Sequence, residues 1–112
     1  MNADQAFDLA VIEAGEAKLK LLGSAAGTTA GKMEMLRADF ENANLKNANF
    51  ENANFSNANF HGAIIDDANF KNTILIGSNI TEEQLSKVAS KECAILPDGT
   101  LFVSNENIKC LF

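Results

Sequence analysis

Few side chains in the chain are capable of chemistry, and they stand apart from one another. His61 is the only histidine, so a histidine metal site or a nucleophilic triad has no second component. Asp66 and Asp67 are adjacent at an expected turn, where acidic residues are common. No partner is apparent that would hold these two carboxylates as an acid/base pair. The sequence therefore predicts no catalytic residue and no metal site, and it indicates a non-enzymatic protein.

A glycine-rich stretch, residues 26–33, superficially has the look of a phosphate-binding loop. In that motif the first residue is glycine, and the last is a serine or threonine whose hydroxyl contacts the metal ion. Here these positions hold Ala26 and Met33, and no predicted strand precedes them. The stretch is therefore not expected to bind a nucleotide, and the sequence predicts no cofactor.

The two cysteines, Cys93 and Cys110, both lie in the last quarter of the chain with 16 residues between them. Neither belongs to a CxxC motif, so a metal knuckle or a redox motif is not supported. In an oxidising compartment the pair is predicted to form a disulfide, which adds about 3 kcal/mol of stability in the chain-entropy model. The alternative is a cytosolic protein with two reduced, partly buried thiols.

The middle of the chain repeats with a period of five residues, and this period indicates which structure positions these side chains. From Ala38 onward, nine consecutive units read ADFEN, ANLKN, ANFEN, ANFSN, ANFHG, AIIDD, ANFKN, TILIG and SNITE. Five residues advance an α-helix by about 500°, so successive units would not share a helical face. In a strand, an odd period would send alternate phenylalanines to opposite faces. A chain that turns a corner of about 90° in each unit fits instead, because four units then close one square coil.

A square coil places the central residue of each unit inside, stacked on the residue twenty positions later. The predicted core columns are Phe40, Phe60 and Ile80; Leu45 and Ile65; Phe50 and Phe70; and Phe55 and Leu75. The alanines that begin the units also point inward, since the interior has no room for a second large side chain per unit. The asparagines are expected at corners, where asparagine tolerates turn conformations and hydrogen-bonds nearby backbone. The alternative is that they form a binding surface.

These units resemble the pentapeptide-repeat family, whose consensus is alanine, then aspartate or asparagine, then leucine or phenylalanine, then two variable residues. The match covers residues 38–81, and residues 33–35 resemble a degenerate first unit. The family folds as a right-handed quadrilateral β-helix, so the resemblance implies an all-β solenoid. The departures from the consensus imply a looser last coil. They are Ile64, Thr73, Ile74 and Ser78.

About two coils cannot shield their own apolar ends, so caps are expected. Thr81 and Gln84 have the spacing of a capping box, and Ile80 and Leu85 have that of a hydrophobic staple. This pattern predicts a helix over residues 82–90. A short hairpin is expected at residues 94–103, around a proline-aspartate-glycine turn.

The predicted organisation is a single domain over residues 1–112 with helical caps at both ends. Residues 1–22 are expected to form an N-terminal helix, because apolar residues recur near one helical face. Residues 23–37 are expected to hold a linker and the degenerate first unit, and residues 38–80 the repeat coils. Residues 81–112 then supply the C-terminal helix, the hairpin and the tail.

The charge balance bears on possible partners. A net charge of -6 would repel phosphate backbones, so nucleic-acid binding is not expected. No apolar run is long enough for membrane insertion. The favoured function is a structural or protein–protein interaction module with an unidentified protein partner. A homo-oligomer through the N-terminal helix or the coil ends is a further possibility.

The family resemblance adds two expectations. Many small members occur in cyanobacteria and in the thylakoid lumen of chloroplasts, usually without an assigned activity. Some members are acidic rods that mimic DNA and bind DNA gyrase, which is the alternative function for this chain. The expected location is the periplasm or the thylakoid lumen if Cys93 and Cys110 are bonded, after removal of a signal peptide, and the cytoplasm otherwise.

Overall fold

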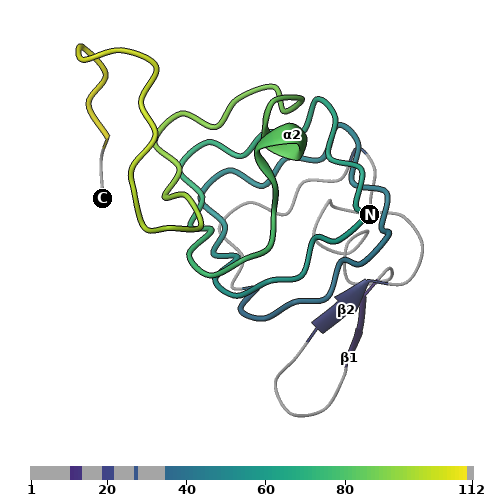
Figure 1. The fold of residues 1–112 in the computed structure, drawn as a ribbon. Coiled ribbons are helices and arrows are strands. Elements are labelled where there is room, and N and C mark those ends of the chain that lie inside the picture. The colour runs from purple at the N-terminus through teal and green to yellow at the C-terminus, as the bar shows by residue number, and fades with distance from the viewer. Residues whose placement is uncertain (1–10, 14–18, 22–26, 28–34, 111–112) are drawn as a thin grey trace.

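The computed structural model describes residues 11–13, 19–21, 27 and 35–110, and most of these form stacked coils (Figure 1). Isolated parallel β-bridges join residues that are twenty positions apart. The bridges are Asp39–Asn59, Asn44–Ile64, Asn49–Asn69 and Asn54–Ile74. One bridge falls in each five-residue unit, so every unit is one wall and four walls complete a turn. The walls are single bridges rather than long strands.

Each wall ends in a tight turn that makes the corner of the coil. The Ala43 N–H donates to the Phe40 carbonyl at 2.9 Å, and Asn42 between them has a φ of 59°. A positive φ at only the third of four residues is the pattern of a type II turn, which favours glycine or asparagine there. The residues that share this corner position and a positive φ are Arg37, Asn42, Asn47, Asn52, Asn57, Gly62, Asp67, Asn72 and Gly77. Backbone geometry therefore accounts for one of the two asparagines in each unit.

The asparagine at the second position of a unit lies at the bridge, and its side chain accepts a hydrogen bond from the backbone of the next corner. The Asn44 Oδ1 accepts the Lys46 N–H at 3.1 Å, and the equivalent residues make the same bond. On one wall these side chains also bond to each other. The Asn59 Nδ2 donates to the Asp39 Oδ1 at 3.1 Å, and the Asn79 Nδ2 donates to the Asn59 Oδ1 at 2.7 Å. These asparagines thus tie successive coils together.

The core fills the inside of the coils. The central residues of all nine units are buried: Phe40, Leu45, Phe50, Phe55, Phe60, Ile65, Phe70, Leu75 and Ile80. Phe40 and Phe60, twenty residues apart, have stacked rings with centroids 5.4 Å apart. Phe50 and Phe70 meet edge to face at 5.5 Å. Small alanines alternate with these rings, which leaves room for the phenylalanines inside the coil.

The N-terminal helix predicted over residues 1–22 is wrong where the structure describes that segment. Strand β1 (Val11–Glu13) pairs antiparallel with β2 (Leu19–Leu21), with Val11 opposite Leu21. Val11 and Ile12 are β-branched and favour a strand, and leucine, lysine and leucine alternate through β2 with period two. Gly15 lowers the helix propensity of the stretch between them. The rest of the predicted helix lies outside the described residues.

The C-terminal helix is present but shorter than predicted. Helix α2 (Glu82–Leu85) starts at the Thr81 cap, and the predicted capping box with Gln84 is confirmed. The prediction that the helix reaches residue 90 is wrong. The chain leaves the helix because it pairs with the coil below: the Asp67 N–H donates to the Lys87 carbonyl at 2.8 Å. Continued helix would have broken this ladder.

The coils also extend beyond the predicted range of residues 38–80. At the N-terminal side, Met35 is buried, and its N–H donates to the Asn54 carbonyl at 2.7 Å. At the C-terminal side, parallel bridges join Asn69 to Ser90 and Ile74 to Ile95. Their spacing is 21 residues instead of 20, because α2 uses one extra residue in that coil. Met35 belongs to the predicted degenerate first unit, so only the boundary placed at residue 80 is corrected.

A hairpin follows the last coil. Ile95 pairs antiparallel with Leu101, and the Leu96 N–H donates to the Thr100 carbonyl at 2.7 Å. Leu85 of α2 is buried in the core cluster, and Val88 and Leu96 pack against it. The C-terminal end of the coils is thus covered by apolar residues of α2 and of the segments that follow it.

Candidate interaction surface

The residues with chemically capable side chains lie at separate outer corners of the coils. His61 is exposed at one corner, and Asp66 and Asp67 lie at the next, where Asp67 has a φ of 61°. Among the residues that the structure describes, no group of three or more histidine, cysteine or acidic side chains is placed to hold a metal ion. The glycine-rich stretch lies outside the described residues except for Gly27, whose N–H donates to the Lys46 carbonyl at 2.8 Å.

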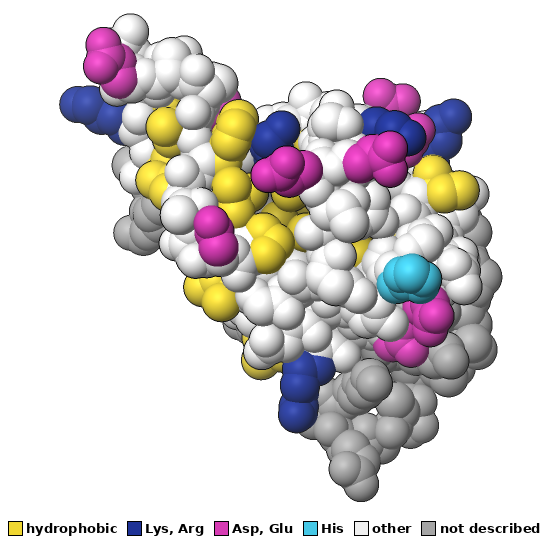
Figure 2. Space-filling view, viewed as in Figure 1, with side chains coloured by type: hydrophobic (Ala, Val, Ile, Leu, Met, Phe, Trp, Pro, Cys, Tyr) yellow, Lys and Arg dark blue, Asp and Glu magenta, His cyan; other side chains and the backbone are white. Residues whose placement is uncertain are grey.

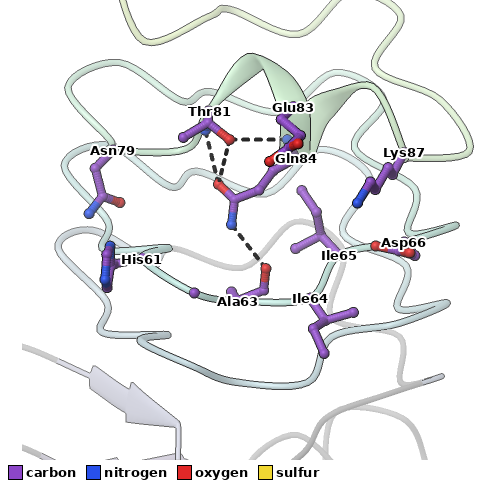
Figure 3. Close-up of a pocket in the computed structure, with 11 residues that line it drawn as sticks. His61, Ala63, Ile64, Ile65, Asp66, Asn79, Thr81, Glu83, Gln84 and Lys87 are labelled. Atoms are coloured by element: carbon purple, nitrogen blue, oxygen red, sulfur yellow. Dashed lines mark hydrogen bonds between the residues drawn. The ribbon is translucent and has the colours of Figure 1, made fainter.

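A hollow of about 320 Å³ lies between α2 and the wall that carries His61 and Asp66 (Figure 3). Gln84 reaches from α2 to this wall. Its Nε2 donates to the carbonyls of Phe60 and Ala63 at 2.8 and 2.9 Å, and its Oε1 accepts the Thr81 N–H at 2.9 Å. The polar groups of Gln84 in this hollow are therefore engaged in holding α2.

The role of Gln84 follows from the pattern of the other coils. One coil below, the carbonyl of Ala43 accepts the Ile64 N–H at 2.9 Å. Ala63 occupies the equivalent position, but the chain above it is helical and offers no strand. The side-chain amide of Gln84 takes the place of the missing backbone N–H. Nothing in this arrangement requires a ligand.

Charged side chains at two corners alternate in sign from coil to coil. Backbone bonds fix which residues stack: the Asn47 N–H donates to the Asp66 carbonyl, and the Asp67 N–H donates to the Lys87 carbonyl. The stacked outward positions are Lys46, Asp66 and Lys87 at one corner, and Glu51, Lys71 and Glu92 at the next. Alternating charges do not repel their neighbours in the stack, so these corners favour stacking of the coils.

One wall differs from the other three because most of its outward side chains are apolar; its first coil carries Asn54, and the coils that follow carry isoleucines. Ile74, Ile95 and Leu101 lie side by side through their bridges, and Ile76 and Pro97 lie next to them at the corner. We call these five residues the apolar wall. Ile76 and Leu101 are 45% and 47% exposed, and the other three are half-buried. Apolar side chains gather in Figure 2 on the side of the molecule where the C-terminal segment runs.

The equivalent positions on the other walls are mostly polar. Asp39, Asn59 and Asn79 line one wall, and Asn49, Asn69 and Ser90 line another. The remaining wall carries Asn44 and a single exposed isoleucine, Ile64, beside the hollow under α2. Adjacent exposed apolar side chains mark interaction sites more often than scattered ones do. The apolar wall is therefore the candidate interaction surface.

The predicted pairing of Cys93 with Cys110 is present as a disulfide. The two Sγ atoms are 2.03 Å apart and the Cα atoms 5.5 Å apart. Cys93 is buried at a corner with a φ of 65°, and Cys110 is half-buried. The bond ties the end of the tail to the last coil, next to the apolar wall. No described helix is long or apolar enough to cross a membrane.

Stacked four-walled coils built from five-residue units define the class: the protein is a solenoid repeat protein. A family model described as pentapeptide repeats matches the chain in eight copies, over residues 34–72 and 53–88. The chain belongs to the pentapeptide-repeat family. Membership implies the right-handed β-helix fold that the family shares. No curated protein sequence matches the chain.

One solved structure is similar to the chain. It is the 2.0 Å crystal structure of HetL, a pentapeptide repeat protein involved in heterocyst differentiation regulation, from the cyanobacterium Nostoc sp. strain PCC 7120. The two chains are 17% identical, with a TM-score of 0.39. The match covers 76% of this chain and 43% of HetL, so this chain spans less than half the length of that relative.

Proposed function

We propose that the protein is a non-enzymatic scaffold that binds a protein partner through its apolar wall. The wall carries this proposal because its exposed isoleucine and leucine side chains are adjacent rather than scattered. Ile76 and Leu101 each leave nearly half of their surface to solvent. Covering such side chains contributes about 25 cal/mol per Å² of apolar surface removed from water.

The coils beneath the wall suit a binding platform. Backbone hydrogen bonds join Phe55, Leu75 and their neighbours to the coils above and below, and these central side chains are buried. A surface that is already ordered loses little conformational entropy on binding, which favours affinity. Three residues of the wall, Ile74, Ile76 and Ile95, lie on these hydrogen-bonded coils.

The alternative of a DNA mimic that binds DNA gyrase has less support. Such a mimic needs rows of negative charge that imitate two phosphate backbones. The outward columns instead alternate, with Lys71 between Glu51 and Glu92, and Asp66 between Lys46 and Lys87. The net charge of -6 remains the only feature in favour of this alternative.

The disulfide supports an oxidising compartment as the place where the protein works, such as the periplasm or the thylakoid lumen. Alkylation of the unfolded protein without reductant, followed by intact-mass measurement, tests this. We expect no alkyl group to be added to protein isolated from its native source. Addition of two alkyl groups would return the cytoplasmic location to first place. Self-association through the coil ends stays a prediction.

Photo-crosslinking tests the proposed docking. A photoreactive phenylalanine analogue replaces Ile76 in one variant and Lys46 in a control variant, and both are expressed in the native host. We expect a discrete adduct of higher mass only for position 76, and its mass spectrum identifies the partner. Equal adducts from both positions, or none from position 76, would contradict the proposal.

A further inference from the structure

A second hollow, about 230 Å³, lies at the C-terminal end of the coils and adjoins the apolar wall. We call it the end hollow. Its lining residues are Ile80, Glu82, Leu85, Leu96, Pro97 and Asp98. Pro97 belongs to both the end hollow and the apolar wall, so the two surfaces are continuous.

The floor of the end hollow is apolar. Ile80 and Leu85 are buried members of the core cluster, and Leu96 packs against that cluster. A volume of about 230 Å³ is below that of the clefts that usually hold whole small molecules. The end hollow therefore suits a single side chain better than a cofactor.

Two carboxylates are among the residues that line the end hollow. Glu82 comes from α2, and Asp98 comes from the turn of the hairpin. Both residues are exposed to solvent. The Asp98 Oδ1 accepts the Thr100 Oγ1–H at 2.7 Å and the Thr100 N–H at 3.0 Å. The Thr100 side-chain and backbone hydrogen bonds lower the pKa of Asp98, so its carboxylate is ionised at neutral pH.

An apolar floor with carboxylates at its rim matches one kind of side chain. Lysine and arginine bury their methylene stems along apolar surface and keep their charged heads in a polar environment. An uncharged aliphatic side chain would use the floor but offer no positive charge to the two carboxylates. An acidic side chain would be repelled by them.

We propose that the end hollow binds a lysine or arginine side chain of the protein that docks on the apolar wall. The stem lies against Ile80, Leu85 and Leu96, and the cationic head lies between Glu82 and Asp98. This inference rests on the proposed function, because it places the cation on the same partner. It adds that the partner presents a basic residue next to an apolar surface.

A pair of matched probes tests the end hollow without the partner. The probes are Nα-acetyl-lysine methylamide and Nα-acetyl-norleucine methylamide, whose side chains share a four-carbon stem but differ in the ammonium group. Each is titrated at low salt into the whole protein, with the methyl signals of Leu85 and Leu96 followed by NMR. We expect saturable shifts with the lysine probe, shifts at least fivefold weaker with norleucine, and loss of the lysine response at high salt.

Substitutions assign the response to the two carboxylates. Asp98→Asn keeps the oxygen that accepts from Thr100, and Glu82→Gln keeps the shape of the side chain. We expect each to weaken lysine binding by up to about fivefold, as for exposed ion pairs. Glu83→Gln is the matched control, because Glu83 is the adjacent residue of α2 and lines the other hollow. It should leave binding unchanged.

Three outcomes would overturn the inference. Equal responses to norleucine and lysine would remove the role of the carboxylates. Equal weakening by Glu83→Gln would show a general charge effect. Signals of Leu85 and Leu96 that shift on simple dilution of the protein would show that a second copy covers the end hollow. Because no partner is present in these titrations, their failure leaves the crosslinking test at position 76 unaffected.

Discussion

Replacement of Gln84 by glutamate should separate the two hydrogen-bonding roles of this side chain, which accepts from Thr81 and donates to Phe60 and Ala63. Glutamate keeps an oxygen that accepts the Thr81 N–H, but as a carboxylate it cannot donate to the carbonyls of Phe60 and Ala63. The Phe60 carbonyl retains the Ala63 N–H at 2.9 Å, so it loses one of two bonds, worth about 0.5–1.5 kcal/mol. The Ala63 carbonyl belongs to a buried residue and loses its donor, which costs about 1–3 kcal/mol.

The expected loss of unfolding free energy for Gln84→Glu is therefore about 1.5–4.5 kcal/mol at pH 7. A protonated glutamic acid can donate again, so the folded-state pKa of this residue should rise above its unfolded value of about 4.3. Between these two values the native state binds more protons than the unfolded state. The loss should thus shrink as the pH falls through the folded pKa and reach its minimum below the unfolded pKa. Part of it remains there, because a carboxylic acid has one O–H donor and Gln84 donates to two carbonyls.

Urea denaturation of the variant and the wild type at pH 7 and pH 4 measures both effects. Thr81→Ala is the control, because it removes the capping hydroxyl and should cost about 1 kcal/mol without this pH dependence. A loss below about 0.5 kcal/mol at pH 7 would refute the view that Gln84 replaces a missing strand. An equal loss at both pH values would refute it as well.

Three further predictions concern the core, a buried hydroxyl and one carboxylate. Phe55→Ala should lower the unfolding free energy by about 3–5 kcal/mol in urea denaturation, because the centroids of four phenylalanine rings lie within 5.8 Å of its own. The exposed control Lys46→Ala should cost under about 0.5 kcal/mol, and equal losses would contradict the register of the coils. Ser78→Ala should raise the unfolding free energy by about 1 kcal/mol, because the buried Ser78 hydroxyl has no hydrogen-bond partner; a lower melting temperature would count against this reading. Thr100→Val should raise the pKa of Asp98 towards its ordinary value in an NMR titration, because the variant lacks the side-chain hydrogen bond that lowers this pKa. In the wild type, the stabilisation from the lowered pKa is present above the unfolded pKa and is lost as the pH falls through the folded pKa. An unchanged pKa of Asp98 in the variant would show that Thr100 has no such effect.

The five-residue period is enough to derive the coils and their interior from the sequence. It places Phe40 above or below Phe60, and it places asparagine at corners, because neither a helix nor a flat strand accommodates an odd period. The capping box at Thr81 could also be read directly, since it depends on residues only three positions apart. These features follow from local spacing.

Features that depend on distant pairing could not be derived in the same way. The chain rejoins the coils after α2 with a spacing of 21 residues, so Ile95 falls beside Ile74 without any repeat motif to indicate it. The pairing of β1 with β2 is local, but the recurrence of apolar residues near one helical face predicts a helix there, whereas the β-branched Val11 and Ile12 favour the strand that forms.

The apolar wall was visible in the sequence only in part. Ile74 departs from the repeat consensus, and this departure by itself predicts only a looser last coil. Its neighbours Ile95 and Leu101 come from the hairpin, which the repeat does not position. The sequence signal for the apolar wall is a set of apolar residues at outward positions, spaced so that they stack in one column: Ile74, Ile95 and Leu101.

The affinity of the partner identified by crosslinking tests the central claim most directly. Ile76→Lys places a charge on the apolar wall, and Ile64→Lys places the same charge at a similarly exposed isoleucine, 50% against 45%, outside that wall. We expect Ile76→Lys to weaken binding at least about tenfold, since burial of a charge opposite an apolar surface is unfavourable, and Ile64→Lys to leave it unchanged. Equal affinities of the two variants would contradict the proposal that the apolar wall is the docking surface.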